Sequence, residues 1–224
     1  MARRSRPPLP ARPHLEIEQA LWSQGVRRVA GIDEAGRGAW AGPVVAAAVV
    51  LPANHPHLLA ALAGVDDSKK LTPATRERLY ACVQEVAVAI GVGRAGPAEV
   101  DRRGLLPATR TAMERAAAAL AIQPEYLIVD AVDLRATIDL PQQSMFFGDA
   151  ISLSVAAASI VAKVSRDRMM VALDHRFPGY GFARHKGYGT RAHQTALALQ
   201  GPSALHRYSF SPVRARVDGS QVED

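Results

Sequence analysis

Four acidic residues follow segments that are otherwise apolar, an arrangement that can bring carboxylates together at one edge of a sheet. Asp33 and Glu34 follow the run from 26 to 32, and Asp130 and Asp149 follow two later runs. Clustered carboxylates raise one another's pKa unless a cation is present. Oxygen ligands select Mg²⁺ or Mn²⁺ rather than zinc, and two such ions about 4 Å apart can hold the attacking and leaving oxygens of a phosphodiester. We therefore predict a two-metal site, with turn formation and surface charge as the alternative interpretation of each acid.

The segment after the first two acids combines glycine with arginine. Adjacent strand residues point to opposite faces, so Asp33 and Glu34 cannot both face one site from a regular strand. We expect the strand to break there, helped by Gly36 and Gly38. Glycines also let backbone N–H groups approach a ligand, and Arg37 can offer two parallel hydrogen bonds to phosphate or hydroxyl oxygens. A plain turn is the alternative, whereas two acids directly ahead argue against a nucleotide-binding loop.

Three other segments place bases and an aromatic ring where a nucleic acid could be held. Ser68 and Lys69 precede a predicted helix, and a capped, solvated helix start is the alternative. A stripe of small and polar residues at helical spacing predicts a polar binding face formed by Ser152, Ala156, Ser159, Lys163 and Arg166. An ion pair of Lys163 with the acid four residues on is the alternative. Lys186 and Tyr188 lie in a glycine-rich loop, where charges suit phosphates and a ring suits a sugar or base. Packing of a half-buried ring is the alternative for Tyr188.

The elements that must position these residues alternate along the chain. We predict strands over 26–32, 43–51, 86–92, 126–129 and 144–147, and helices over 15–24, 72–83, 105–120, 152–177 and 190–201. We expect 52–66 to form a loop with a short helical piece. We expect Gly91, Gly93 and Gly96 to end the third strand and 178–190 to form a loop. This order predicts a mixed α/β sheet with helices packed on it, and the two consecutive strands at the start favour an antiparallel hairpin.

Length and composition restrict the class of protein. The chain has 224 residues, of which 48% are hydrophobic and 21% charged, so it is neither disordered nor of low complexity. The single cysteine, Cys82, excludes a disulfide framework and a cysteine-based zinc site, and fits a reducing, cytoplasmic compartment. No apolar run reaches the roughly 18 residues of a membrane span. The first 14 residues carry four Arg and several Pro, and we expect a disordered basic tail there rather than a secretory signal.

The net charge of +6 favours an anionic partner and is unevenly distributed. Residues 160–191 hold seven basic and two acidic residues, and the first 14 residues carry four Arg and no acid. The remainder of the chain, which carries the four acids, is net negative. This distribution predicts that the basic segments hold the substrate and that the acidic remainder of the chain holds the metal ions.

An ordered set of motifs resembles bacterial ribonuclease HII from about residue 26 to 212. The motifs are GIDEAGRG (Gly31–Gly38), AGPVVAAAVVL, DSKKL (Asp67–Leu71), YLIVD, GDAISLSVAAASIVAKVSRDR (Gly148–Arg168) and YGFARHKGYGT (Tyr180–Thr190). The resemblance implies an RNase H-like mixed five-stranded sheet flanked by helices, with a small helical C-terminal extension. We accordingly expect a tail over 1–14, a catalytic domain over 15–190, and a C-terminal helical extension and tail over 191–224.

The resemblance also implies an activity and its residues. It implies an endonuclease that cuts the RNA strand of RNA–DNA hybrids and incises 5′ of a single ribonucleotide in duplex DNA, leaving 3′-hydroxyl and 5′-phosphate ends. Its two ions would be held by Asp33, Glu34, Asp130 and Asp149. Gly36, Arg37 and Gly38 would read the ribose 2′-hydroxyl, Tyr188 would sense the junction, and Ser68, Lys69, Lys163 and Lys186 would bind substrate. We expect a monomer; the sequence indicates no membrane association and no protein partner.

Two positions depart from the family pattern. The family usually has Gly after the third acid, where this chain has Ala131, and a proline after the glycine–arginine–glycine motif, where it has Ala39 and Trp40. The first change should alter the local turn more than the ligand. A nucleic-acid-binding module without activity and a small phosphoester hydrolase are the competing classes.

Overall fold

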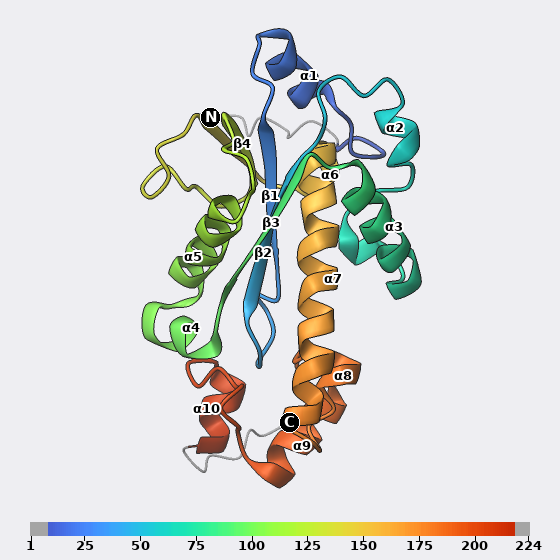
Figure 1. Ribbon diagram of the computed structural model, residues 1–224. Helices are drawn as coiled ribbons and strands as arrows, with labels where there is room; N and C mark the ends of the chain where they lie inside the picture. The colour runs from blue at the N-terminus through green and yellow to red at the C-terminus, as the bar shows by residue number, and fades with distance from the viewer. Residues whose placement is uncertain (1–8, 218–224) are drawn as a thin grey trace, which may run out of the picture.

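The computed structural model describes residues 9–217, which contain one five-stranded sheet of order β3-β2-β1-β4-β5 (Figure 1). The strands are β1 Val29–Ala35, β2 Val44–Val50, β3 Ala89–Ala95, β4 Tyr126–Asp130 and β5 Gln142–Met145. β1, β2 and β3 pair antiparallel, whereas β4 runs parallel to β1 and β5 parallel to β4. The predicted mixed sheet and its initial hairpin are therefore confirmed.

Helices surround the sheet and extend beyond one end of it. They are α1 Glu16–Ser23, α2 Leu58–Ala61, α3 Pro73–Val86, α4 Pro97–Arg103, α5 Leu105–Ala118, α6 Gly148–Ile151, α7 Leu153–Arg176, α8 Phe182–His185, α9 Arg191–Gln200 and α10 Ser211–Val217, with a short 3-10 turn, η1, at Ser68–Lys70. The predicted helix starts are confirmed, because Thr72, Ser152 and Thr190 accept backbone N–H groups as N-caps of α3, α7 and α9. The sequence did not predict α4, α6 or α8, and it predicted α10 only as part of the C-terminal helical extension.

Two apolar layers enclose the sheet. The long helix α7 crosses one face of it, with α3 outside, and α5 covers the other face (Figure 1). Alternate residues of β2 enter each layer: Ala47 and Val49 pack with the α7 side, and Ala46 and Ala48 with the α5 side. Burial on both faces explains why β2 is continuously apolar.

The third strand does not stop at its glycines. Gly91 and Gly93 lie inside β3, so the expectation that they end it was wrong. A Cβ at either position would overlap a carbonyl oxygen of α5, that of Ala116 or of Ala112. Both residues are glycine because the α5 backbone lies directly against the strand, a contact that the local sequence does not reveal.

The ends of the described chain are held by the body of the protein. Of the predicted tail, residues 1–8 lie outside the described residues, and His14 exchanges backbone hydrogen bonds with Ile151 and Leu153 at 3.0 and 2.9 Å. The expected helical extension is confirmed by α9 and α10, and residues 218–224 lie outside the described part. No helix within residues 9–217 is long and apolar enough to cross a membrane.

Candidate active site

The first two acids lie within β1 rather than at a break in it. Asp33 and Glu34 pair with Ala47 and Ala46 of β2, so the expected end of the strand before them was wrong. On the other side, the pairing of β1 with β4 ends at Ile32, because β4 ends at Asp130. Beyond Ile32, no strand within residues 9–217 pairs with the side of β1 that faces β4. The side chains of Asp33 and Glu34 leave β1 on opposite faces of the sheet. Because this side of the strand is unpaired, both can lie close to Asp130.

The other two acids are held by a tight turn after β4 and β5. Asp130 Oδ1 accepts the N–H of Gly148 at 2.7 Å. Asp149 lies in the first turn of α6, where the sequence predicted the end of a strand. Ala131 has a left-handed φ of 53°, a conformation that favours glycine, so an alanine at this position strains the turn beside Asp130.

Burial and mutual repulsion make the four carboxylates unfavourable as neighbouring anions. Burial raises the pKa of Asp33 well above its ordinary value, and the carboxylates of Glu34, Asp130 and Asp149 raise it further. Burial also raises the carboxyl pKa of Glu34, Asp130 and Asp149. Among the described residues, Asp33 Oδ2 and Glu34 Oε2 are buried without a hydrogen-bond partner. Unpartnered buried carboxylate oxygens are the chemistry that fits a divalent cation.

A lysine supplies positive charge at this site. Lys69 Nζ lies 3.3 Å from Asp149 Oδ2 and 3.7 Å from Asp67 Oδ1. Burial alone would lower the pKa of Lys69, but the carboxylates of Asp149, Asp67 and Asp33 outweigh it and raise the pKa. In the part of the chain that the structure describes, no three acidic, histidine or cysteine side chains form a ready-made metal cage. Asp33, Glu34, Asp130 and Asp149 would hold a divalent ion here, and Asp149 already shares its carboxylate with Lys69.

The glycine–arginine–glycine segment borders the acids. Gly36 has φ +94°, and a Cβ there would overlap the buried guanidinium of Arg166. The half-exposed side chain of Arg37 donates to Glu34 Oε1 at 3.3 Å. A Cβ added at Gly38 would meet no described atom within 4 Å, so this position faces open space. Gly36 is required by packing, whereas Gly38 leaves room on the open side.

Two buried arginines that the sequence did not single out as site residues hold this segment. Arg166 donates to the carbonyls of Pro43 and Ala41 at 2.9 and 3.1 Å. Arg207 donates to the Arg37 carbonyl at 2.8 Å and twice to that of Gly42. Burial lowers the pKa of Arg207 to about 9. The Arg166 part of the predicted polar stripe on α7 therefore packs inside the protein instead of presenting a binding face.

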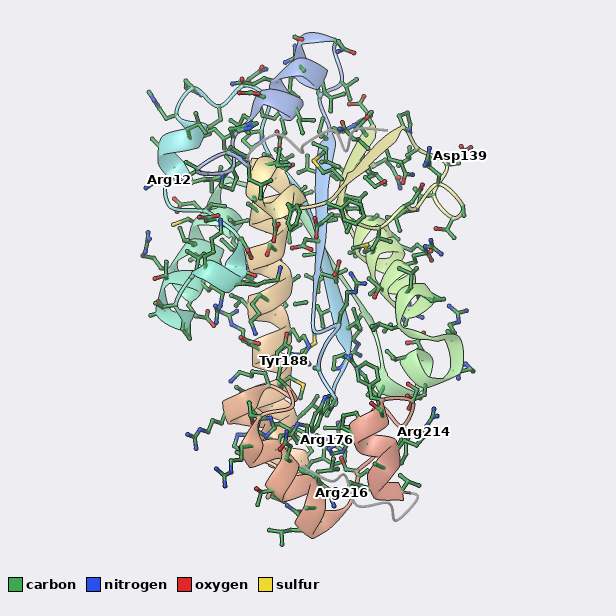
Figure 2. The ribbon with its side chains drawn as sticks, turned by 180° about the vertical axis from the view of Figure 1, so that it is seen from behind. Arg12, Asp139, Arg176, Tyr188, Arg214 and Arg216 are labelled. Atoms are coloured by element: carbon green, nitrogen blue, oxygen red, sulfur yellow. The ribbon has the colours of Figure 1, made fainter. Side chains whose placement is uncertain are left out.

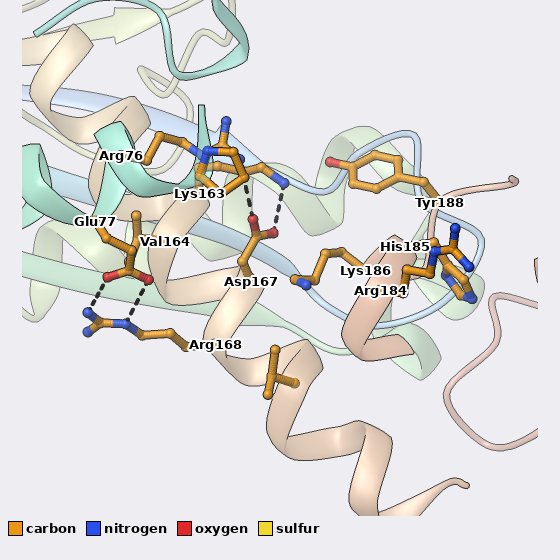
Figure 3. Close-up of a pocket in the computed structure, with 12 residues that line it drawn as sticks. Arg76, Glu77, Lys163, Val164, Asp167, Arg168, Arg184, His185, Lys186 and Tyr188 are labelled. Atoms are coloured by element: carbon orange, nitrogen blue, oxygen red, sulfur yellow. Dashed lines mark hydrogen bonds and ion pairs between the residues drawn. The ribbon is translucent and has the colours of Figure 1, made fainter. Parts of the chain in front are cut away.

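A cleft of about 610 Å³ brings most of the predicted residues together. Its lining includes Glu34, Gly36, Arg37, Gly38, Ser68, Lys69, Asp130, Lys163 and Tyr188. Lys186 lines a neighbouring groove of about 520 Å³ that shares Arg76, Lys163 and Tyr188 with the cleft (Figure 3). Seen from behind, Tyr188 lies beside α7, above the C-terminal helices (Figure 2).

Several of these side chains also make internal contacts. Lys163 forms the predicted ion pair with Asp167 at 2.7 Å, and its Nζ lies 5.3 Å from the centre of the Tyr188 ring. The Ser68 hydroxyl is buried against Ser159 Oγ at 2.8 Å. Lys186 ends α8 and donates to a carbonyl of that helix. Lys163 and Lys186 still line open grooves, whereas Ser68 chiefly anchors η1 to α7.

Two further residues of the site were missed by the sequence reasoning. Asp67 is close enough to Asp149 to raise its pKa, although burial is the larger cause. Arg76 lines the cleft and donates to the Ser68 and Leu71 carbonyls at 2.9 and 2.6 Å. Their positions in the sequence could have indicated both residues. Asp67 is the first residue of the DSKKL segment, and Arg76 lies in the first turn of α3, the helix that follows this segment.

Asp33 and Glu34 lie on the central strand, Asp130 lies on its parallel neighbour, and a cleft lined by basic residues lies beside them. This arrangement defines a nuclease of the RNase H-like fold. The solved ribonuclease H2 of Pyrococcus horikoshii is similar, with a TM-score of 0.72 and 27% identity over 86% of this chain and 98% of that one. The expected fold class is thereby confirmed.

The chain belongs to the ribonuclease HII family, whose model matches residues 30–213. It is 56% identical to the ribonuclease HII of Chloroflexus aurantiacus over 204 residues, which are 90% of this chain and 94% of the relative. A ribonuclease HII from Archaeoglobus fulgidus, solved in complex with PCNA, has a TM-score of 0.69 and 29% identity, covering 82% of this chain and 95% of that one. The expected identity as an endonuclease of the RNase H family is confirmed.

Proposed function

We propose that this protein incises duplex DNA on the 5′ side of a single embedded ribonucleotide, in addition to the ribonuclease H activity on RNA–DNA hybrids that its family supports. The observation that carries the proposal is one cleft in which Glu34 and Asp130 face Arg37 and Tyr188. The cleft thus contains both carboxylates that attract cations and side chains that can recognise a ribose. A role in ribonucleotide and RNA-primer removal, as a cytoplasmic monomer, belongs to the same proposal.

The four acids have the oxygen chemistry to hold two divalent ions, Mg²⁺ or Mn²⁺. When bound, such ions activate a water molecule and stabilise the leaving 3′ oxygen. Asp33 and Glu34 offer unpartnered buried oxygens for this purpose, and the Gly148 N–H orients Asp130. Lys69 is placed to balance the negative charge of Asp149 before the ions and substrate arrive.

Substrate selection would depend on groups that distinguish ribose from deoxyribose. Hybrid duplexes are recognised mainly by shape and backbone, and the 2′-hydroxyl separates RNA from DNA. Gly38 leaves room for a sugar to approach, and the Arg37 side chain is half-exposed at the same side of the cleft. The Arg207 guanidinium holds the Arg37 carbonyl, so the backbone of this reader is fixed before substrate binds.

A cleavage assay on duplex DNA that contains one ribonucleotide tests the proposal directly. We expect a single incision 5′ of the ribonucleotide that requires Mg²⁺ or Mn²⁺, and no cleavage of the all-DNA duplex. Salt-sensitive binding without any product would instead favour a binding module. Hydrolysis of a mononucleotide with indifference to duplexes would favour a small phosphoester hydrolase.

Replacing Arg37 with alanine should weaken the preference for ribonucleotide-containing duplex over all-DNA duplex. We expect roughly a 10-fold loss in the ratio of binding constants, because a charge-assisted hydrogen bond contributes about 1.5–3 kcal/mol. Competition binding in Ca²⁺ measures that ratio without turnover. Arg135→Ala is the matched control, since Arg135 is exposed and pairs with Asp133 away from the cleft. An unchanged ratio in Arg37→Ala would contradict the role of Arg37.

Replacing Tyr188 with alanine should reduce cleavage at a DNA–RNA–DNA junction more than cleavage of a long hybrid. The expected loss in kcat/KM at the junction is roughly 10-fold or more, because stacking on an aromatic ring contributes about 1–3 kcal/mol. Tyr188→Phe keeps the ring near Lys163 and Arg166 and should retain most of the activity. Equal losses on both substrates in Tyr188→Ala would count against junction sensing.

A further inference from the structure

Tyr188 lies in a glycine-flanked turn that is held in part by its neighbours: its N–H donates to the His185 carbonyl at 3.0 Å, and its carbonyl accepts the Thr190 N–H at 2.8 Å. Glycine precedes and follows it, and Gly187 has a left-handed φ of 81°. Residues from other segments fix this backbone: Trp40 N–H donates to the Gly187 carbonyl at 2.8 Å, and the Trp40 ring covers Gly189 so closely that a Cβ there would overlap it. The position of Tyr188 therefore depends on Trp40, which is distant in sequence, as well as on the local turn.

Two buried histidines of the C-terminal segment reach the Tyr188 peptide group. His193 Nδ1 lies 3.0 Å from the Tyr188 carbonyl oxygen, and His193 Nε2 lies 3.0 Å from His206 Nε2. His206 Nδ1 in turn accepts the Ser203 N–H at 2.9 Å. Both side chains are fully enclosed, and burial lowers the pKa of each to about 4, so both are neutral at pH 7.

The two ends of this chain of bonds determine where its protons lie. A backbone N–H can only donate, so His206 Nδ1 is the acceptor from Ser203 and the His206 proton is on Nε2. That proton is donated to His193 Nε2, which leaves the His193 proton on Nδ1. A carbonyl can only accept, so His193 Nδ1–H donates to Tyr188. One tautomer of each ring satisfies every bond, and it aims a donor at the Tyr188 carbonyl.

The packing around these rings prevents them from turning away. His193 stacks on His185 with ring centres 4.4 Å apart, and Trp40 and Phe182 each lie 5.6 Å from it. The centre of the Tyr188 ring lies 5.3 Å from the Lys163 ammonium and 5.2 Å from the Arg166 guanidinium. His193 thus holds the Tyr188 carbonyl. The Tyr188 ring faces the Lys163 side chain across the groove (Figure 3).

We propose that His193 is a positioning residue for Tyr188 and that His206 sets the tautomer of His193. This inference rests on the junction-sensing role proposed above for Tyr188. It extends the site into a segment that touches no reacting group: His193 would act on substrate choice only through the tyrosine. The same contacts give the C-terminal extension a part in recognition.

Two amide substitutions separate positioning from packing. Asparagine at 193 can place its N–H₂ near the Nδ1 position and keep the bond to Tyr188, whereas glutamine can place its amide near Nε2 and keep only the bond to His206. We expect His193→Gln to lower kcat/KM at a DNA–RNA–DNA junction roughly 10-fold, with less than about a threefold loss on a long hybrid. His193→Asn should stay within about threefold of wild type on both.

Coupling to the tyrosine provides the second measurement. If His193 acts through Tyr188, the double variant His193→Gln/Tyr188→Ala should lose no more junction activity than Tyr188→Ala alone. Leu197→Ala is the matched core control, because Leu197 is buried on the same helix as His193 but is not one of the rings that pack on it. This variant should lower the melting temperature without changing the ratio of the two substrates. Nitrogen-15 NMR should find His193 protonated at Nδ1 at neutral pH.

Each contrary outcome has a distinct meaning. Equal effects of His193→Gln and His193→Asn, additive losses in the double variant, or a His193 ring protonated at Nε2 would overturn the inference while leaving the proposed function intact. If Tyr188→Ala itself leaves the junction preference unchanged, the proposed role of Tyr188 fails and the inference falls with it.

Discussion

Replacing Asp33 with asparagine is expected to abolish cleavage and, at the same time, to stabilise the metal-free protein. Asp33 is fully buried in β1, its pKa is raised by burial and by three neighbouring carboxylates, and its Oδ2 has no partner among residues 9–217. Divalent ions supply several kcal/mol of transition-state stabilisation, so we expect cleavage to fall by at least about 10³-fold. Binding of the hybrid without metal should survive, because it depends mainly on the basic groove.

The stabilisation follows from the same repulsion. A carboxylate whose pKa is raised by folding destabilises the folded state at neutral pH, and the amide is neutral while keeping an acceptor for the Glu34 N–H that Asp33 Oδ1 accepts at 2.7 Å. We expect a gain of about 1 kcal/mol, seen as a rise of roughly 3 °C in melting temperature. The gain should shrink as the pH falls, since protonation removes the same charge in the wild type.

A charge-matched control is available for this variant. Asp139→Asn removes one negative charge from an exposed position and should change neither activity nor stability. Thermal melts in chelator, with and without added Mg²⁺, should also show that Mg²⁺ stabilises the wild type more than Asp33→Asn. An active Asp33→Asn enzyme would show that the site is assigned to the wrong carboxylates.

Replacing Gly36 with alanine is expected to lower the stability of the folded protein more than any other substitution proposed here. Its φ of +94° disfavours any side chain, and the new Cβ would overlap the Arg166 guanidinium. Arg166 cannot retreat, because it is buried and donates to the Ala41 and Pro43 carbonyls. Strain and overpacking together should cost roughly 3 kcal/mol, which lowers the melting temperature by roughly 10 °C. Ribonucleotide preference should fall as well, because Arg37 follows directly.

The second glycine of the motif provides the matched comparison. Gly38→Ala adds the same methyl group where no described atom lies within 4 Å and φ is not left-handed. Its melting temperature should match that of the wild type, while its affinity for ribonucleotide-containing duplex should fall because the methyl group occupies space on the substrate side. Equal melting temperatures for Gly36→Ala and Gly38→Ala would contradict the proposed division between a packing glycine and a contact glycine.

Local chemistry was the dependable part of the sequence-based prediction. Thr72, Ser152 and Thr190 cap helices that begin where predicted, because a cap needs only a side-chain oxygen and the next few backbone N–H groups. The errors came from residues whose role depends on a distant element. Gly91 and Gly93 were interpreted as strand breakers, although they are the surface on which α5 packs.

The sequence alone determined the order of the elements, the four candidate acids, the oxygen-loving metals they suit and the family resemblance, because residue types and short spacings carry that information. The tertiary structure decided that Asp33 and Glu34 share one site from a continuous strand, since β4 ends one residue after its last pairing with β1. It also decided which side chains hold the glycine–arginine–glycine segment, because Arg207 is 170 residues from the Arg37 carbonyl to which it donates. A buried donor needs an acceptor, and the fold decides which acceptor lies near it, so the local sequence does not reveal the pairing.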